Sequence, residues 1–504
     1  MEENKAMRDG DGYFSLSVLA DCFSGRLTVR GDSVCADLRV AEIVIDSRRV
    51  GKNSLFVALT GEHEDGERYA ADAFRRGAVA ILCRTGGADR IKAAGVYIEV
   101  EDPLSALVQA ALRVRTDSDF FVVGITGSVG KTTVKELSVK VLSQRYPTDG
   151  TKGNYNNLLG LSLSILNAFG VDKIGELRGK SLGKGRKHLV LEMGISHRGE
   201  MEELARVARP DIAIVTNVGK MHAEHLGGRE GSAEEKCKIA SMGVEKVICP
   251  CDDTVLEQVL RYVERKRVIV LSISENTKQF SDVTHAVIER GSGSGEFSLI
   301  FRENSGNNTE YGRFTAPIVG DHGIWNSAIA ALLGWTLGLS GDEVARGFTD
   351  FQPASMRQEI RTDGGIIRIV DCYNSGPESA RAALSVLSEY VRENGCARRI
   401  AVLGDMLELG DISEKEHFML GQTLVTYGVD LLFTVGKRSE MIADGAISGG
   451  MPEECAVRFG FDTPYEAMKE RIESALRVGD IILYKASRGI GLERVIPEKV
   501  CSER

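Results

Sequence analysis

The sequence lacks long apolar runs, an excess of basic residues and a regular set of cysteines. No stretch approaches the roughly 18 apolar residues of a membrane-spanning helix, and Met1–Lys5 leads into no apolar core of a secretory leader. We therefore expect a cytoplasmic protein without membrane insertion. The formal net charge of -9 is the wrong sign for binding a phosphate backbone, so nucleic acid is not an expected partner.

The ten cysteines are scattered from Cys22 to Cys501, and the only close pair is Cys249 and Cys251. One intervening residue is fewer than the about two to four that separate paired ligands in zinc sites. Free cysteine packs as a small hydrophobic residue. We therefore expect reduced and mostly buried thiols rather than a disulfide framework.

Length and patterning predict three α/β domains. Residues 1–115 combine short strands with glycine-rich turns, 116–350 alternate strands and helices, and 351–504 repeat that alternation. Such alternation predicts parallel sheets that are covered on both faces. We expect a small mixed α/β N-terminal domain, a central P-loop-type ATPase α/β domain and a C-terminal Rossmann-like α/β domain.

Local patterns predict the elements of these domains. The expected strands are short apolar runs at 120–123, 188–192, 212–215, 367–370, 400–403, 431–435 and 481–484. A buried helix is expected over 326–339, and a charged link over 113–119. A linker is expected over 351–355, and a mobile basic, glycine-rich surface loop over 175–187.

The clearest chemical motif is the glycine-rich run at 124–133, which follows an apolar strand and opens a helix. Gly127 and Gly130 allow backbone N–H groups to turn toward phosphate oxygens. The helix start contributes a partial positive charge there, and Lys131 contributes a full one. The hydroxyl of Thr132 is placed to bind Mg²⁺. The strand–loop–helix context favours a variant phosphate loop over a glycine-rich turn that binds nothing.

Further polar residues follow two other predicted strands. Glu192 ends the strand at 188–192, where ligands of open α/β sheets collect, and its carboxylate could reach Mg²⁺. His222 and Lys236 follow the strand at 212–215. Taken singly, Glu192 is as often an ordinary strand-end acid as a ligand, and a lone histidine such as His222 is more often structural. Lys236 alone is typical of a solvated charge on a helix.

Together these motifs resemble those of the Mur ligase family. The matching segments are 126–136, Gly153–Asn157 with the pattern G-N-x-N-N, Glu192–Glu200 with the pattern E-M-G-x-x-x-x-G-E, and Asn217–His222 followed by Lys236. Within the family, Gly404–Gly410 and Lys485–Arg488 resemble the branch that adds a dipeptide. The resemblance extends from about residue 40 to the C-terminus.

The resemblance implies an ATP- and Mg²⁺-dependent ligase of peptidoglycan precursor synthesis. Such a ligase joins a UDP-N-acetylmuramoyl tripeptide to D-alanyl-D-alanine through an acyl phosphate. The resemblance assigns the UDP substrate to residues 1–115, ATP to residues 116–350 and the dipeptide to residues 351–504. We expect small-molecule partners and a monomer. The alternatives are a sister ligase that adds one amino acid, a folylpolyglutamate-type ligase, and a non-catalytic nucleotide-binding scaffold.

The resemblance also implies roles for individual residues. The catalytic residues would be Lys131, Glu192, His222 and Lys236. The metal ligands would be Thr132, Glu192, His222 and Lys236, the last as a carbamate, which requires a lysine that is neutral when modified. The ATP contacts would be Gly127, Ser128, Val129, Gly130, Lys131, Thr132, Thr133, His322, Asn326, Arg357, Asp371, Tyr373 and Asn374. The substrate contacts would be Ser47, Arg48, Asn154, Asn156 and Asn157.

Overall fold

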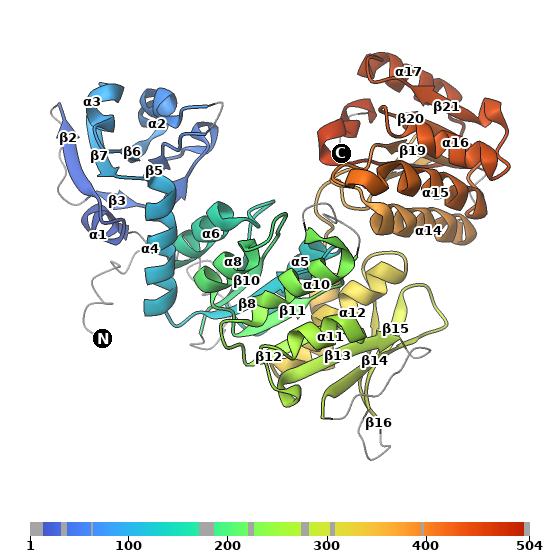
Figure 1. Cartoon of the computed structure of the whole chain (residues 1–504), viewed down its shortest axis with the longest axis horizontal. Coiled ribbons are helices and arrows are strands. Elements are labelled where there is room, and N and C mark those ends of the chain that lie inside the picture. Colours follow the sequence, from blue (N-terminus) through green and yellow to red (C-terminus); the bar gives the residue numbers. More distant parts are fainter. Residues whose placement is uncertain are drawn as a thin grey trace.

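The computed structural model shows three α/β domains, each built on its own main sheet (Figure 1). It describes residues 14–31, 38–61, 64–170, 186–219, 226–273, 282–302, 308–394 and 398–497. The N-terminal and C-terminal domains lie on opposite sides of the central domain (Figure 1). This confirms the predicted fold class. Among the described residues, no helix is long and apolar enough to cross a membrane.

The N-terminal domain has a five-stranded sheet in the order β2-β7-β6-β5-β4, which is parallel except for β2. Its elements are β1 (Phe14–Ser15), α1 (Leu16–Cys22), β2 (Arg26–Arg30), β3 (Arg39–Val40), β4 (Glu42–Val44), β5 (Ser54–Val57), α2 (Ala70–Arg76), β6 (Ala78–Arg84), α3 (Gly87–Ile91) and β7 (Gly95–Val100). Helix α4 (Pro103–Asp117) follows and leads to the central domain.

The central domain has a nine-stranded sheet in the order β16-β15-β14-β13-β12-β11-β8-β10-β9. Its strands are β8 (Phe121–Thr126), β9 (Thr148–Gly150), β10 (His188–Glu192), β11 (Ile212–Val215), β12 (Lys246–Pro250), β13 (Val268–Ile273), β14 (Thr284–Arg290), β15 (Glu296–Arg302) and β16 (Asn308–Thr315). Its helices are α5 (Lys131–Leu142), α6 (Leu158–Gly170), α8 (Glu200–Ala208), α10 (Gly228–Cys237), α11 (Asp253–Val259), α12 (Asp321–Thr336) and α13 (Gly341–Thr349).

Alternating residues of the central strands enter two different cores. Val122 on β8 packs into the core under α4, α6 and α8, whereas Val123 packs into the core under α5 and α12. Leu189 and Val190 on β10 divide in the same way. Successive side chains of a strand point to opposite faces, so these apolar runs require helices on both sides of the sheet.

The C-terminal domain has a six-stranded sheet in the order β17-β18-β22-β19-β20-β21. Its elements are β17 (Glu359–Asp363), β18 (Ile366–Val370), α14 (Pro377–Asn394), β19 (Arg399–Gly404), α15 (Ser413–Thr426), β20 (Leu431–Val435), α16 (Glu440–Ser448), β21 (Ala456–Phe459), α17 (Tyr465–Ala475) and β22 (Ile481–Lys485). Its two core clusters are built from its own buried residues, and Val319 of the central domain packs against one of them. The N-terminal domain, in contrast, shares one core with the central domain through α4.

The structure corrects two predictions about sheet and helix. The sheets are not wholly parallel, because β14, β15 and β16 pair antiparallel, as do β17 and β18. Only the residues 291–295 join β14 to β15, which is too short for the crossover that parallel strands need. Helix α12 spans Asp321–Thr336 rather than 326–339, and Gly338, with φ of 77°, follows its end in the left-handed region.

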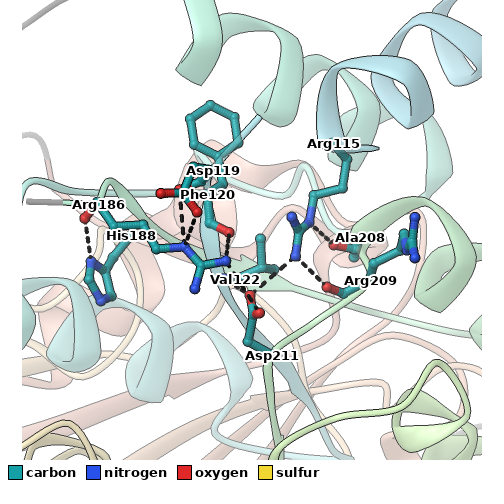
Figure 2. Close-up of polar contacts among 9 residues, drawn as sticks. All are labelled: Arg115, Asp119, Phe120, Val122, Arg186, His188, Ala208, Arg209 and Asp211. Carbon is teal, nitrogen blue, oxygen red and sulfur yellow. Dashed lines mark hydrogen bonds and ion pairs between the residues drawn. The ribbon is translucent and has the colours of Figure 1, made fainter. Parts of the chain in front are cut away.

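The prediction of a charged link at 113–119 was wrong, because the residues up to Asp117 form the last turns of α4. The Arg115 side chain is buried, with Nε donating to Ala208 O at 2.8 Å and Nη2 to Arg209 O at 2.7 Å. Nη2 also pairs with Asp211 at 3.1 Å (Figure 2). The Asp211 carboxylate in turn accepts from the Val122 N–H at 2.7 Å. Arg115 therefore ties α4 to the end of α8 and to β8.

The described cysteines agree with the prediction of reduced and mostly buried thiols. All seven that the structure describes are free thiols, and five of them are buried. Within the loop predicted at 175–187, only Arg186 and Lys187 are described. Arg186 donates to Asp119 O and to Phe120 O, at 3.1 and 2.8 Å (Figure 2). The rest of that prediction lies outside the described residues.

Replacing Arg115 with leucine should lower the free energy of unfolding by about 2 kcal/mol, because the Ala208 and Arg209 carbonyls would lose a buried donor. Asp211 would keep only its longer ion pair with Arg186, at 3.5 Å. Arg113→Leu, on the same helix, should change the free energy of unfolding by less than about 1 kcal/mol, because the Arg113 side chain is 53% exposed. Urea unfolding followed by tryptophan fluorescence measures both, since both tryptophans, Trp325 and Trp335, lie on α12. Equal effects of the two substitutions would contradict a structural role for the buried Arg115 side chain.

Candidate functional site

A cavity of about 1190 Å³ lies between the central and C-terminal domains and reaches Leu104 at the start of α4. Its lining comes from the carboxyl ends of β8, β10 and β11, the first turns of α12, and the loops after β18, β19 and β22. Strand β8 lies between β10 and β11, although β9 and β10 follow it in the chain. The cavity thus opens where the strand order reverses, the usual ligand position in such sheets.

The phosphate loop joins β8 to α5, as predicted, and its residues Ser128 to Thr133 line the cavity. Gly127 and Gly130 have φ of 149° and 85°. A β-carbon would lie 2.0 Å from Thr216 Oγ1 at Gly127, and 2.5 Å from Asn326 Oδ1 at Gly130. Only glycine fits at either position, so the loop forms the close backbone cradle that a phosphate group needs.

Lys131 is the first residue of α5, and its ammonium lies within this cradle. Its Nζ donates to Gly127 O at 2.6 Å and to Ser128 O at 3.3 Å. Burial lowers the pKa of Lys131, while the nearby Glu192 carboxylate opposes that shift and Arg357 adds to it. The loop thus holds a cation at the start of a helix, where backbone N–H groups also point.

Asn217, the first residue of the Asn217–His222 segment and not among the predicted site residues, fixes the shape of the phosphate loop. Its Oδ1 accepts from the Val129 N–H, its Nδ2 donates to Val129 O, and its own backbone carbonyl accepts from the Ser128 N–H. Thr216 Oγ1 also donates to Val129 O, at 2.6 Å. The signal that could have identified Thr216 and Asn217 is their position directly after β11, because β11 pairs with β8, the strand that leads into the phosphate loop.

Glu192, at the end of β10, joins the phosphate loop to the run Gly153–Asn157. Its Oε2 accepts from Thr132 Oγ1 at 2.8 Å, and its Oε1 accepts from Asn156 Nδ2 at 3.0 Å. Asn154, Asn156 and Asn157 all line the cavity. The structure therefore brings the predicted metal ligands Thr132 and Glu192 together with the predicted substrate-binding loop.

Lys236 lies on α10 with its side chain buried, and its Nζ donates to Ser232 Oγ one turn earlier. Burial lowers its pKa to about 7, and the charge of Lys131 adds to that effect. Such a lysine is partly neutral near pH 7, the state from which a carbamate forms. Lys236 does not line the cavity. The predicted partner His222 lies outside the described residues.

The residues predicted near the nucleotide lie on both walls of the cavity. His322 and Asn326 come from the first turns of α12, and Arg357, Asp371, Tyr373 and Asn374 come from the C-terminal domain. The Arg357 guanidinium stacks 4.0 Å above the Tyr373 ring. Burial lowers the pKa of His322, and the charge of Asp371 opposes the shift, as does a hydrogen bond with Gln358. Gln358 is a further lining residue that the motifs did not indicate.

Ser47 and Arg48 lie apart from this lining. They form a short 3₁₀ turn in which Arg48 pairs with Asp46 at 2.9 Å, and the Arg48 side chain is 84% exposed. The next residue, Arg49, donates to Tyr155 Oη at 3.2 Å. This turn of the N-terminal domain therefore adjoins the Gly153–Asn157 run of the central domain.

The donor set fits ATP and one Mg²⁺. The loop supplies a glycine cradle and a cation for phosphates, while Thr132 and Glu192 supply a hydroxyl and a carboxylate oxygen, which are hard donors of the kind Mg²⁺ prefers. Of the second predicted metal set, the described residues include only Lys236.

Comparison with known proteins gives matches along most of the chain. The models of the Mur ligase family, catalytic domain, the Mur ligase middle domain, and the Mur ligase, glutamate ligase domain match residues 39–115, 125–334 and 356–488. The chain is 32% identical to the UDP-N-acetylmuramoyl-tripeptide--D-alanyl-D-alanine ligase of Bacillus subtilis (strain 168), over 91% of this chain and 93% of that protein. It is 30% identical to the same-named ligase of Treponema pallidum (strain Nichols), over 93% and 96%.

Solved structures agree with these matches. MurF from Acinetobacter baumannii superposes with a TM-score of 0.74 at 26% identity, over 96% of this chain and 98% of that chain. MurF ligase from Thermotoga maritima, solved in complex with ADP, superposes with a TM-score of 0.68 at 27% identity, over 90% and 96%.

Carbamylation of Lys236 should depend on pH. With a pKa of about 7, Lys236 is mostly neutral at pH 8 and mostly protonated at pH 6. A carbamate resonance in ¹³C NMR with labelled bicarbonate, at constant dissolved CO₂, should therefore weaken as the pH falls through 7. It should disappear in Lys236→Ala and persist in Lys238→Ala, because Lys238 is paired with Glu235 and its pKa is raised. No signal from the unaltered protein at pH 8 would exclude the modification.

Proposed function

The chain belongs to the Mur ligase family, and on this premise we propose that it joins D-alanyl-D-alanine to a UDP-N-acetylmuramoyl tripeptide in peptidoglycan precursor synthesis. It is an ATP-dependent ligase that uses Mg²⁺. The observation that carries the proposal is one cavity lined both by the ATP-loop residues and by parts of the segments Gly404–Gly410 and Lys485–Arg488, which resemble the dipeptide branch.

The proposed reaction forms an amide in two steps. A carboxylate oxygen of the tripeptide attacks the γ-phosphorus of ATP, and ADP leaves with the electron pair of the broken P–O bond. The dipeptide amine then attacks the acyl carbon, inorganic phosphate leaves, and the amine loses a proton. Negative charge gathers in both steps, so preorganised cations and N–H donors supply most of the stabilisation.

The chain's own residues divide this work. Lys131 and the N–H groups of the phosphate loop bind the phosphates, and we assign Thr132 and Glu192 to hold Mg²⁺. The metal, when bound, would neutralise charge on the phosphate oxygens. His222 and carbamylated Lys236 are assigned to a second ion. Asn154, Asn156 and Asn157, which line the cavity, would orient the substrate there.

We assign the UDP end of the substrate to the N-terminal domain, residues 1–115, and ATP to residues 116–350. The cavity supports this assignment because it extends to Leu104 on α4, and because Arg49 contacts Tyr155 beside it. We assign Ser47 and Arg48 to the UDP moiety on resemblance alone. The incoming dipeptide is assigned to residues 351–504. We also propose a cytoplasmic monomer.

The two branch-specific segments support a dipeptide acceptor over a single amino acid. The Leu407 N–H donates to Ser487 Oγ at 2.9 Å, and Ser487 Oγ donates to Ser375 O at 3.1 Å. Lys485 pairs with Asp371 at 2.9 Å. Leu407 and Glu408 of the first segment, and Lys485, Ser487 and Arg488 of the second, line the same cavity as the phosphate loop.

Lys131→Ala should abolish turnover with little loss of stability, because the substitution removes the phosphate-loop cation and no core contact. Steady-state phosphate release measures the first effect and thermal unfolding the second. Lys140→Ala is a matched control, since Lys140 lies exposed on the same helix. Near-normal turnover by Lys131→Ala would show that the loop does not bind the reacting phosphate.

Phosphate release from ATP should require both a UDP-N-acetylmuramoyl tripeptide and D-alanyl-D-alanine. D-alanine or glutamate alone should give much lower rates, because a single amino acid leaves part of the C-terminal wall unfilled. The comparison of these amines at equal concentration tests the acceptor. Faster turnover with a single amino acid would instead favour a sister ligase.

A further inference from the structure

Lys135 is a buried cation to which the proposed reaction gives no role. Its side chain is among the largest fully buried ones of the described residues. Its Nζ donates to Thr151 O at 2.7 Å and to the carboxylate of Glu136. A buried ammonium costs free energy unless it is paired, so a lysine at such a position is expected to determine the position of its partners.

The partner Thr151 leads directly to the site. Thr151 Oγ1 accepts from the Glu192 N–H at 3.1 Å. The Glu192 carboxylate accepts from Thr132 Oγ1 at 2.8 Å. Thr132 and Lys135 are one turn apart on α5 and so share a face of that helix. These four residues therefore form a closed ring that joins α5, the segment after β9 and the end of β10.

The ring also holds the loop Gly153–Asn157. Asn156 Nδ2 donates to Glu192 Oε1 at 3.0 Å, and the Gly194 N–H donates to Asn156 O at 2.8 Å. A β-carbon at Gly150 would lie 3.3 Å from Lys135 Cδ and 3.1 Å from Val190 O. The Lys135 stem therefore packs closely against the strand that leads into the loop.

Only some members of this network reach the cavity. Thr132, Asn156 and Glu192 line it, whereas Lys135 and Thr151 do not. Lys135 thus acts on the cavity only through the residues that it holds.

We propose that Lys135 is a positioning residue that fixes the Glu192 carboxylate and the Asn154–Asn157 loop relative to the phosphate loop. The inference rests on the proposed function, in which Thr132 and Glu192 hold Mg²⁺. Outer-shell groups orient metal ligands, and their loss typically lowers metal affinity or activity by about 10- to 100-fold. Nucleotide binding without metal depends on the loop itself and should not need Lys135.

The test is calorimetric binding of ADP, with EDTA or with Mg²⁺, to the full chain and to Lys135→Met. Methionine keeps much of the apolar stem and removes the charge and the donors. With EDTA, the two proteins should bind ADP within about twofold of each other. Mg²⁺ should increase the affinity for ADP by a factor that is at least about 10-fold smaller in Lys135→Met than in the unaltered protein. In steady-state kinetics, kcat should fall while KM for ATP with excess Mg²⁺ changes less.

Two further variants complete the test. Lys140→Met replaces an exposed lysine of α5 and should behave as the unaltered protein. Thr151→Val keeps the shape but removes the oxygen that accepts from the Glu192 N–H, so it should also lose Mg²⁺-dependent binding. It decides the question if thermal unfolding shows that Lys135→Met does not fold.

The outcomes separate this inference from the function on which it rests. If the unaltered protein shows no Mg²⁺-dependent ADP binding, the proposed metal site fails. If the unaltered protein shows it and Lys135→Met or Thr151→Val, when folded, retains it in full, the positioning role is overturned. Equal loss with EDTA and with Mg²⁺ would also overturn it, since that loss would indicate a general distortion of the loop.

Discussion

The hydrogen bond between Thr132 and Glu192 is the contact on which the arrangement of the site depends. It exists because β8 and β10 are adjacent and parallel, so that their carboxyl ends meet at one edge of the sheet. One strand continues into the phosphate loop, and the other ends in a carboxylate. The register of that single strand pair therefore determines whether a hydroxyl and a carboxylate can share one metal ion. The Asn154–Asn157 loop and the buried Lys135 both act by holding this pair.

Much of the fold could be predicted from the sequence because its signals are local. The apolar runs ending at Thr126, Glu192 and Val215 are β8, β10 and β11, close to their expected bounds. The position of the phosphate loop between a strand and a helix could be predicted, because its glycines and the helical pattern that follows them are recognisable in the sequence. The cavity brings together the predicted ATP-loop residues with His322, Asn326 and the residues of the C-terminal domain.

What the sequence could not supply depends on tertiary contacts. A charged stretch such as 113–119 is typical of a solvated link, yet Arg115 is buried because Asp211 and two carbonyls at the end of α8 meet it there. The antiparallel strands β15 and β16 differ from the parallel strands in burial, since β15 alternates buried and half-exposed residues and β16 is mostly polar and exposed. That pattern and their short connections are what distinguish them in the sequence. Asn217 opens a matching segment that gives no hint of its contacts, and Gln358 belongs to no motif, so their roles follow only from where neighbouring strands and domains place them.

The division of cores has a mechanical consequence. The N-terminal and central domains share one continuous apolar core through α4, so neither can rotate against the other without exposing buried side chains to water. The C-terminal domain has its own cores and meets the central domain around a cavity. Among the described residues, the C-terminal domain therefore shares less apolar packing with the central domain, through Val319, than the N-terminal domain does. This packing predicts that a pulling force on the two ends of the chain would detach the C-terminal domain before it parts the other two.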